Sequence, residues 1–204
     1  MNILKKNYTF LLLSLLYILV GSSFLFFIQK GDVVLALNGL HSPFLDFFFG
    51  NLTHLGDGVF IALVTVGWIF RSKWQGVILA ISCVVNALVI QLLKYSFAYP
   101  RPASVLDPSA YHAVAGVKLN HYLSFPSGHT NGAFALLFGV AFLSNNKLVQ
   151  TICAIMAMFI ALSRIYLVQH FLMDTVAGAG IALVVSWLVF YIAIEKTGLK
   201  NKLN

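Results

Sequence analysis

The chain has 204 residues, of which 60% are hydrophobic and only 9% are charged, and its formal net charge is +7. This composition excludes a water-soluble globular domain, because soluble proteins average about 45–50% apolar residues. It also argues against nucleic-acid binding, since the basic residues are scattered through loops between apolar runs and form no basic stripe.

Six apolar segments follow one another along the chain and predict membrane-spanning helices, because lipid offers no water to backbone groups and helices satisfy those groups internally. In chain order they cover residues 8–28, a second segment that ends at residue 70, then 74–94, 127–143, 148–167 and 172–194. The amphipathic stretch 45–58, interrupted by Gly50, Asn51 and Asp57, predicts a short interfacial helix before the second span. We therefore expect an all-α, polytopic membrane protein: a six-transmembrane-helix bundle with a short interfacial helix, an outer loop and one membrane-embedded domain over residues 1–204.

Basic residues in the loops predict the orientation, because cytoplasmic loops carry the excess of Lys and Arg. With the N-terminus inside, the cytoplasmic ends hold the following basic residues: Lys5, Lys6, Arg71, Lys73, Lys147, Lys196, Lys200 and Lys202. The other side holds Lys30, Lys118 and three further basic residues that belong to the motifs described next. We therefore expect an integral protein of the inner (plasma) membrane with both termini in the cytoplasm.

The third predicted span ends in the cluster Lys94-x6-Arg101-Pro102 on the predicted outer side. The planar guanidinium of arginine fits phosphate oxygens in pairs, and lysine acts on them as a point charge. An isolated basic residue at the end of a span more often reaches for the lipid headgroups. Because Arg164 at the end of the fifth span adds a third charge on the same side, we expect a phosphate-binding group instead.

The connection over residues 95–126 is the one sizeable loop in the sequence pattern, and loops of such length in compact domains are often functional. His54 and Asp57 lie near the same outer end, before the second span. Two interpretations of these two residues stay open: they shape the entrance for a substrate, or they cap a helix.

The fourth predicted span begins at Pro126-Ser127-Gly128-His129. Ser127 is a favoured residue for a helix N-cap, and the free N–H groups of a first helical turn form a binding site for anions. Gly128 allows a ligand to approach the backbone closely, and His129 is placed to give a proton to a leaving oxygen. The plainer interpretation is a capped helix start with a histidine there by chance.

The fifth and sixth spans meet at Ser163-Arg164-x5-His170-x3-Asp174. His170 and Asp174 are four residues apart and would share a face of one helix. A carboxylate that accepts one imidazole N–H fixes the tautomer and leaves the other nitrogen free as a nucleophile or base. The alternative is an ion pair that ties the last helix to a neighbour. The predicted topology places this cluster and the two preceding ones on one side of the membrane.

Taken together, the three clusters resemble the signature of the type 2 phosphatidic acid phosphatase superfamily, whose catalytic core is shared with vanadium haloperoxidases. That signature reads K-x6-R-P, then P-S-G-H, then S-R-x5-H-x3-D. The chain carries it at every fixed position: Lys94, Arg101, Pro102, Pro126, Ser127, Gly128, His129, Ser163, Arg164, His170 and Asp174. The joint match over the motif core 94–174 is far more specific than any single cluster.

The resemblance implies a role for each matching polar residue. His170 would attack phosphorus and form a phospho-histidine intermediate, with Asp174 orienting it. His129 would protonate the leaving oxygen and then activate water. The residues that would hold the phosphoryl oxygens are Lys94, Arg101, Ser127, Gly128 and Arg164. No metal or other cofactor is implied, because the positive charges come from side chains.

The sequence therefore predicts a metal-independent membrane phosphatase whose partners are the lipid bilayer and a lipid phosphate, with its active site on the periplasmic or extracytoplasmic side. Undecaprenyl pyrophosphate, phosphatidylglycerophosphate, phosphatidic acid and lipid A phosphates all fit such a site, and the first two are preferred. A lipid-linked phosphotransferase that uses the same site is one alternative, and a non-enzymatic carrier of lipid phosphates is another. The complete set of two histidines and an aspartate argues against the carrier, since binding alone needs only the cations.

Overall fold

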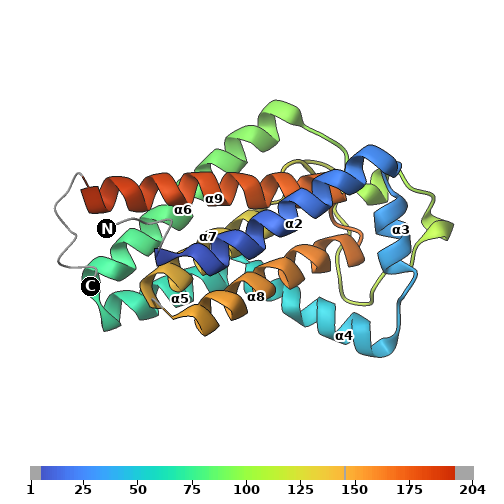
Figure 1. The fold of residues 1–204 in the computed structure, drawn as a ribbon. Coiled ribbons are helices and arrows are strands. Elements are labelled where there is room, and N and C mark those ends of the chain that lie inside the picture. Colours follow the sequence, from blue (N-terminus) through green and yellow to red (C-terminus); the bar gives the residue numbers. More distant parts are fainter. Residues whose placement is uncertain (1–5, 145, 196–204) are drawn as a thin grey trace.

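The computed structural model describes residues 6–144 and 146–195, and within these residues the protein consists of helices and loops without β-strands (Figure 1). The helices in chain order are α2 (Tyr8–Phe27), α3 (Asp32–Asn38), α4 (Pro43–Leu52), α5 (Gly58–Arg71), α6 (Lys73–Phe97), α7 (Gly128–Ser144), α8 (Lys147–Tyr166) and α9 (Leu172–Glu195). Short 3-10 helices lie between them at η1 (Thr53–Gly56), η2 (Pro102–Ser104) and η3 (Pro108–Ala110). The prediction of an all-helical protein is confirmed.

Four helical segments of the described chain are long and apolar enough to cross a membrane: Tyr8–Phe27, Lys73–Ser104, Lys147–Tyr166 and Leu172–Glu195. A fifth exists if α3 and the α4–η1 segment, which meet at a bend of 119°, count as one broken span. Helix α5 has 14 residues and α7 has 17, fewer than the roughly 20 that a straight span needs. The protein is thus an integral membrane protein with four or five spans by length and composition, and the total of six stays a prediction.

Helix α7 lies in the middle of the bundle, and this position explains why it need not be apolar along its whole length. It packs against α5, α6, α8 and α9, and its residues Phe134, Ala135 and Phe138 are fully buried. A helix that is surrounded by protein does not have to present an apolar surface to lipid. Hydropathy alone is therefore a weak indicator of whether α7 crosses the membrane.

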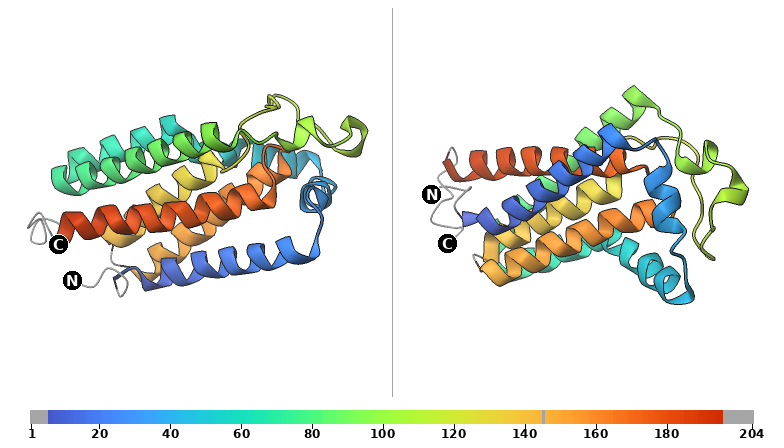
Figure 2. Two further views of the ribbon diagram at one scale, coloured as in Figure 1. Left: turned by 90° about the horizontal axis from the view of Figure 1, so that it is seen from above. Right: turned by 45° about the vertical axis from the view of Figure 1, so that its right-hand side comes forward.

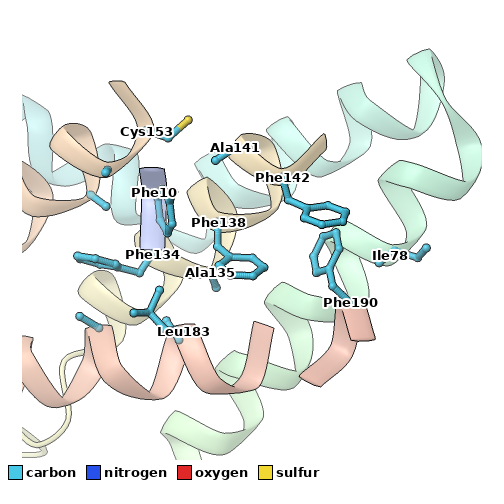
Figure 3. Packing of buried hydrophobic residues seen from close by; sticks show 14 of the residues in the cluster. Phe10, Ile78, Phe134, Ala135, Phe138, Ala141, Phe142, Cys153, Leu183 and Phe190 are labelled. Atoms are coloured by element: carbon cyan, nitrogen blue, oxygen red, sulfur yellow. The ribbon is translucent and has the colours of Figure 1, made fainter. Parts of the chain in front are cut away.

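Phenylalanines from different helices form the core at the centre of the bundle (Figure 3). Phe10 of α2 meets Phe138 of α7 edge to face, with ring centroids 6.0 Å apart, and Phe142 of α7 meets Phe190 of α9 at 5.0 Å. Aromatic pairs of this geometry contribute about 0.5–1.5 kcal/mol beyond the burial of their area. They hold α2, α7 and α9 together and so position the helix ends that carry the motifs.

One end of the bundle collects α3, α4 and the long connection between α6 and α7, while α2 begins and α9 ends at the opposite end (Figure 1 and Figure 2). A helix is found where the interfacial helix was predicted over 45–58, since α4 and η1 cover this stretch and follow Ser42, whose side chain accepts the N–H of Leu45. Its position at the membrane interface stays a prediction. Helix α3 has no counterpart in the sequence prediction, because seven residues are too few to display a helical period. Some of the residues used to predict the orientation lie outside the described part of the chain: Lys5, Lys196, Lys200 and Lys202.

Candidate active site

The three sequence clusters meet at the end of the bundle that carries α3 and α4. Helices α6 and α8 run toward this end, and α7 and α9 run away from it (Figure 1). Lys94 lies in the last turn of α6 and Arg164 in the last turn of α8, whereas His129 and Asp174 lie in the first turns of α7 and α9. The alternation of helix directions therefore brings residues that are far apart in the sequence to one place.

Two turns of the chain fold the clusters into this arrangement. Helix α6 stops at Ala98, whose left-handed conformation (φ of 49°) redirects the chain so that Arg101 returns to the bundle. Between α8 and α9, the carbonyl of Arg164 accepts the N–H groups of Gln169 and His170 at 2.9 and 3.1 Å. This second turn holds the backbone of His170 close in space to the backbone of Arg164.

His170, Asp174 and Ser124 form a buried hydrogen-bonded group. The Nδ1 atom of His170 lies 3.3 Å from Asp174 Oδ2, and the hydroxyl of Ser124 donates to the same carboxylate oxygen at 2.5 Å. The N–H of Phe171 donates to this oxygen as well, at 2.9 Å. The carboxylate therefore faces Nδ1 and leaves Nε2 as the reactive nitrogen. Ser124 is a partner that no spacing in the sequence indicated.

Arg101 and Arg164 are both buried, and both are held by residues that the sequence did not indicate. Arg101 donates through Nε to the carbonyl of Tyr122 at 2.8 Å and through Nη1 to the backbone and side-chain oxygens of Gln169 at 3.2 Å. Arg164 donates through Nη1 to the hydroxyl of Thr53. The Nε atom of Arg164 is buried and has no hydrogen-bond partner among the described residues. Because an unpaired buried donor is unfavourable, this atom marks a place where an anion would bind.

Lys94 lies beside the start of α7. A Cβ atom placed on Gly128 would be 3.8 Å from Lys94 Nζ, so a side chain at this position would touch the amine. Ser127 caps the helix, since its Oγ accepts the hydroxyl of Thr130 at 2.9 Å and the N–H of Thr130 at 3.4 Å. The N–H of Ser127 donates to the carbonyl of Asp174 at 2.9 Å. The hydroxyl oxygen of Ser127 thus accepts, and its N–H donates, within the protein, and the following amides of the first turn are the donors that we expect to meet an anion.

His129 contacts a carboxylate whose role the sequence left open. Its Nε2 atom lies 2.6 Å from Asp57 Oδ1. The other oxygen of this carboxylate, Oδ2, lies 2.8 Å from Nδ1 of His54. Asp57 therefore joins two histidines, one of which belongs to the second motif cluster.

The surroundings of His170 keep its imidazole neutral. Burial is the largest cause, and the positive charges of Arg101, Arg164 and Lys94 add to it, so that the pKa of His170 lies well below its usual value. The side chain is only 1% exposed. A neutral imidazole carries the lone pair that a nucleophile needs.

A cavity of about 380 Å³ opens between α5, α6 and α7 and reaches the same group of residues. Small or apolar side chains such as Ile61 and Ala87 line most of it, and one end is formed by Lys94, Gly128 and His129. Its volume falls in the range of about 300–1,000 Å³ that is typical of ligand pockets. The cavity thus joins an apolar space among the helices to the charged group.

The connection between α6 and α7 is fastened to α4 and to the end of α8 by a second contact between histidine and aspartate. Nε2 of His112 lies 2.9 Å from Asp46 Oδ2, and the hydroxyl of Tyr166 donates to Asp46 Oδ1 at 2.5 Å. None of these residues belongs to the motif clusters. Throughout residues 6–144 and 146–195, no group of three or more His, Cys, Asp or Glu side chains is arranged to hold a metal ion.

Comparison with known proteins gives matches in sequence and matches in structure. A sequence model of the PAP2 superfamily matches residues 75–197. Phosphatidylglycerophosphatase B of Bacillus subtilis is 27% identical over 166 residues, which cover 74% of this chain and 76% of that protein. The undecaprenyl-diphosphatase of Sulfolobus acidocaldarius is 32% identical over 133 residues, which cover 63% of this chain and 59% of that protein. The crystal structure of Aquifex aeolicus LpxE is similar with a TM-score of 0.72 and 25% identity, over 80% of this chain and 96% of that chain.

Proposed function

The chain belongs to the PAP2 superfamily, as the motif signature predicted, and on this premise we propose that it hydrolyses the phosphate of a membrane lipid through a phospho-histidine intermediate at the outer face of the membrane. Two of the relatives are named as phosphatases of lipid phosphates, which supports the class of reaction and of substrate. We further propose that residues 1–204 work as one membrane-embedded domain.

The observation that carries this proposal is the meeting of a neutral, buried histidine with three cations. Asp174 and Ser124 hold one side of His170, and the unpaired Nε of Arg164 supplies a donor for an anion. Phosphoryl transfer depends mostly on positioning and on stabilising the charge of the phosphoryl oxygens. A carrier would need the cations but would not need a histidine held by a buried carboxylate, so this geometry favours an enzyme.

In the proposed reaction, Nε2 of His170 attacks phosphorus, and the bond between phosphorus and the leaving oxygen breaks. His129 gives its proton to that oxygen. Water then attacks the phospho-histidine, His129 takes a proton from the water, and the N–P bond breaks to release phosphate and restore His170. Lys94, Arg101 and Arg164 hold the phosphoryl oxygens throughout, so the reaction needs no metal ion to neutralise them.

The cavity between α5, α6 and α7 supports a lipid as the substrate. A hydrocarbon chain placed among its apolar walls would bring the attached phosphate to Lys94, Gly128 and His129 at the cavity's end. A lipid dissolved in the bilayer can reach such a site from the side without leaving the membrane.

We propose that the end of the bundle with the motif clusters faces the periplasmic or extracytoplasmic side. Arg71 ends α5, Lys73 begins α6 and Lys147 begins α8, all at the other end of the bundle. The excess of basic residues in cytoplasmic loops supports this orientation. If α5 and α7 cross the membrane as well, the spans number six and both termini lie in the cytoplasm.

The test is phosphate release by the purified protein from four lipids in turn: undecaprenyl pyrophosphate, phosphatidylglycerophosphate, phosphatidic acid and a lipid A phosphate. We expect the first two to be the best substrates and the rate to be unaffected by a chelator. His170→Ala is expected to lower kcat by roughly a thousandfold or more, because the nucleophile is lost. Undiminished turnover by this variant would remove His170 as the nucleophile. A newly phosphorylated acceptor lipid without free phosphate would identify a phosphotransferase instead.

A further inference from the structure

Asp57 is not a helix cap, although it stands where a cap would stand. It directly precedes α5, a position from which an aspartate usually accepts an N–H of the first helical turn, yet its side chain makes no such bond. Its two oxygens lie instead at 2.6 Å from Nε2 of His129 and at 2.8 Å from Nδ1 of His54. From this geometry we propose that Asp57 is a positioning residue for His129, which it holds in the orientation and the protonated form that an acid catalyst needs. The inference rests on the proposed phosphatase function.

The charges around His129 explain why a carboxylate is needed beside it. Burial acts most strongly against a positive charge on this imidazole, and Arg164 from α8 and Lys94 from α6 add to the effect. His170, which precedes α9, lies within the same field. Asp57 supplies the opposite charge. Without it, the cations that bind the phosphate would drive the proton off the acid before the leaving oxygen could accept it.

The same contact decides which ring nitrogen can act. Because Nε2–H is donated to Asp57, Nδ1 is the nitrogen left for the leaving oxygen. When the bond between phosphorus and that oxygen breaks, the oxygen receives the Nδ1 proton and His129 becomes neutral, and the attacking water later returns a proton. Gly56 allows the segment before α5 to lie close to the start of α7, since a Cβ atom on Gly56 would lie 3.1 Å from the carbonyl oxygen of His129. His54 lies on the other oxygen of the carboxylate, and its side chain is 71% exposed.

The test compares two substrates whose leaving groups differ in their need for a proton. Dodecyl phosphate releases an alkoxide, which needs an acid, whereas p-nitrophenyl phosphate releases a stable phenolate, which does not. In the full-length protein we expect Asp57→Asn to lower kcat for dodecyl phosphate by roughly 100-fold, and kcat for p-nitrophenyl phosphate by less than about fivefold. Asp57→Glu restores much of the loss, because it returns the carboxylate. In Asp57→Asn the alkaline limb of kcat for dodecyl phosphate moves to lower pH, since the acid loses its proton more easily.

Asp46→Asn is the matched control, because Asp46 also binds a histidine at this end of the molecule but contacts no motif residue. It is expected to leave the ratio of the two kcat values unchanged, and thermal unfolding shows whether each variant is folded. Equal losses on both substrates in Asp57→Asn, or no loss at all, would overturn the inference. If His170→Ala loses activity but the Asp57 variants keep the kcat values of the wild type, the proposed function stands and only this inference fails. If the wild type releases phosphate from neither substrate, the proposed function fails, and this inference fails with it.

Discussion

The hydroxyl of Ser124 lies 2.5 Å from Asp174 Oδ2 and 3.5 Å from His170 Nδ1, so it touches both members of the pair. Ser124 comes from the long loop between α6 and α7, whereas the pair lies at the start of α9, and it is fully buried. We infer that Ser124 fixes the carboxylate in the way that the carboxylate fixes the imidazole. Loop and helix must both be in place before the nucleophile is aligned.

Ser124→Ala is expected to lower kcat by roughly tenfold or more, because a buried hydrogen bond to a charged group contributes about 1.5–3 kcal/mol. KM changes little, since the hydroxyl lies behind His170 and not beside the phosphate. Steady-state kinetics on the preferred lipid checks this, with Ser109→Ala in the exposed part of the loop as the control. An unchanged kcat would mean that the N–H of Phe171 is enough to fix the carboxylate.

The lowered pKa of His170 predicts how the rate depends on pH. A group with a lowered pKa gives up its proton at lower pH, so the acid limb of kcat/KM lies below the usual histidine value of about 6.5. Arg101→Gln removes one of the charges that lower this pKa, so His170 keeps its proton to a higher pH and the acid limb moves upward. Profiles of kcat/KM against pH check this shift. Arg71→Gln, at the other end of the bundle, leaves the limb in place, and a downward shift in Arg101→Gln would contradict the electrostatic account.

The residues that do the chemistry could be predicted from the sequence, whereas the residues that hold them could not. Reaction at phosphorus requires particular residue types at fixed spacings, and charged groups are conspicuous in an apolar chain. Ser124, Gln169 and Thr53 are ordinary polar residues whose partners are set by where the loops return. Asp57 was visible as a polar residue near the site, but its contact with His129 depends on how α5 packs against α7.

At the scale of helices, the starts of α7 and α9 touch through a glycine. A Cβ atom on Gly178 would lie 2.7 Å from the carbonyl oxygen of Ser127, which is closer than real contacts allow, whereas a Cβ atom on Gly180 would meet nothing within 4 Å. A pattern of small residues such as Gly178-Ala179-Gly180 indicates close helix packing but not which glycine provides it. In the structure, Gly178 provides the close contact and Gly180 does not.

Gly178→Ala is expected to lower the free energy of unfolding by about 1–3 kcal/mol, because a methyl group must displace backbone at the start of α7. Activity falls as well, since the same displacement moves the first turn of α7 and His129 with it. Gly180→Ala is the matched control and leaves both quantities unchanged. Thermal unfolding in detergent and the rate on one lipid are measured for both variants. Equal stability and equal activity of the two variants would show that α9 can move to accommodate the methyl group.

The long helices could be predicted closely because lipid requires long apolar runs. The segment predicted over 172–194 is found as Leu172–Glu195, and that predicted over 8–28 as Tyr8–Phe27. Helix α3 could not be predicted, since its stability comes from burying Val34 against the turn between α8 and α9. The number of spans is hard to predict for the related reason that α5 and α7 are short and rely on neighbouring helices.

For the whole molecule, orientation in the membrane decides which lipids the site can meet. Ser109 lies exposed in the outer loop, and Lys147 lies exposed at the start of α8 at the opposite end. In a background without Cys83 and Cys153, we expect a membrane-impermeant maleimide to label Ser109→Cys in intact cells and Lys147→Cys only after lysis. The reverse pattern would place the site on the cytoplasmic face.

The two residues proposed to form and support the phospho-enzyme flank the start of α9, the last helix of the described chain. A ribosome must therefore translate past Asp174, and the membrane must accept α9, before His170 and Asp174 can meet Lys94 and His129. During synthesis the growing chain is surrounded by phospholipids whose phosphates resemble its substrates. We expect it to be inert toward them until α9 is inserted, so that the order of the residues along the chain itself delays the activity.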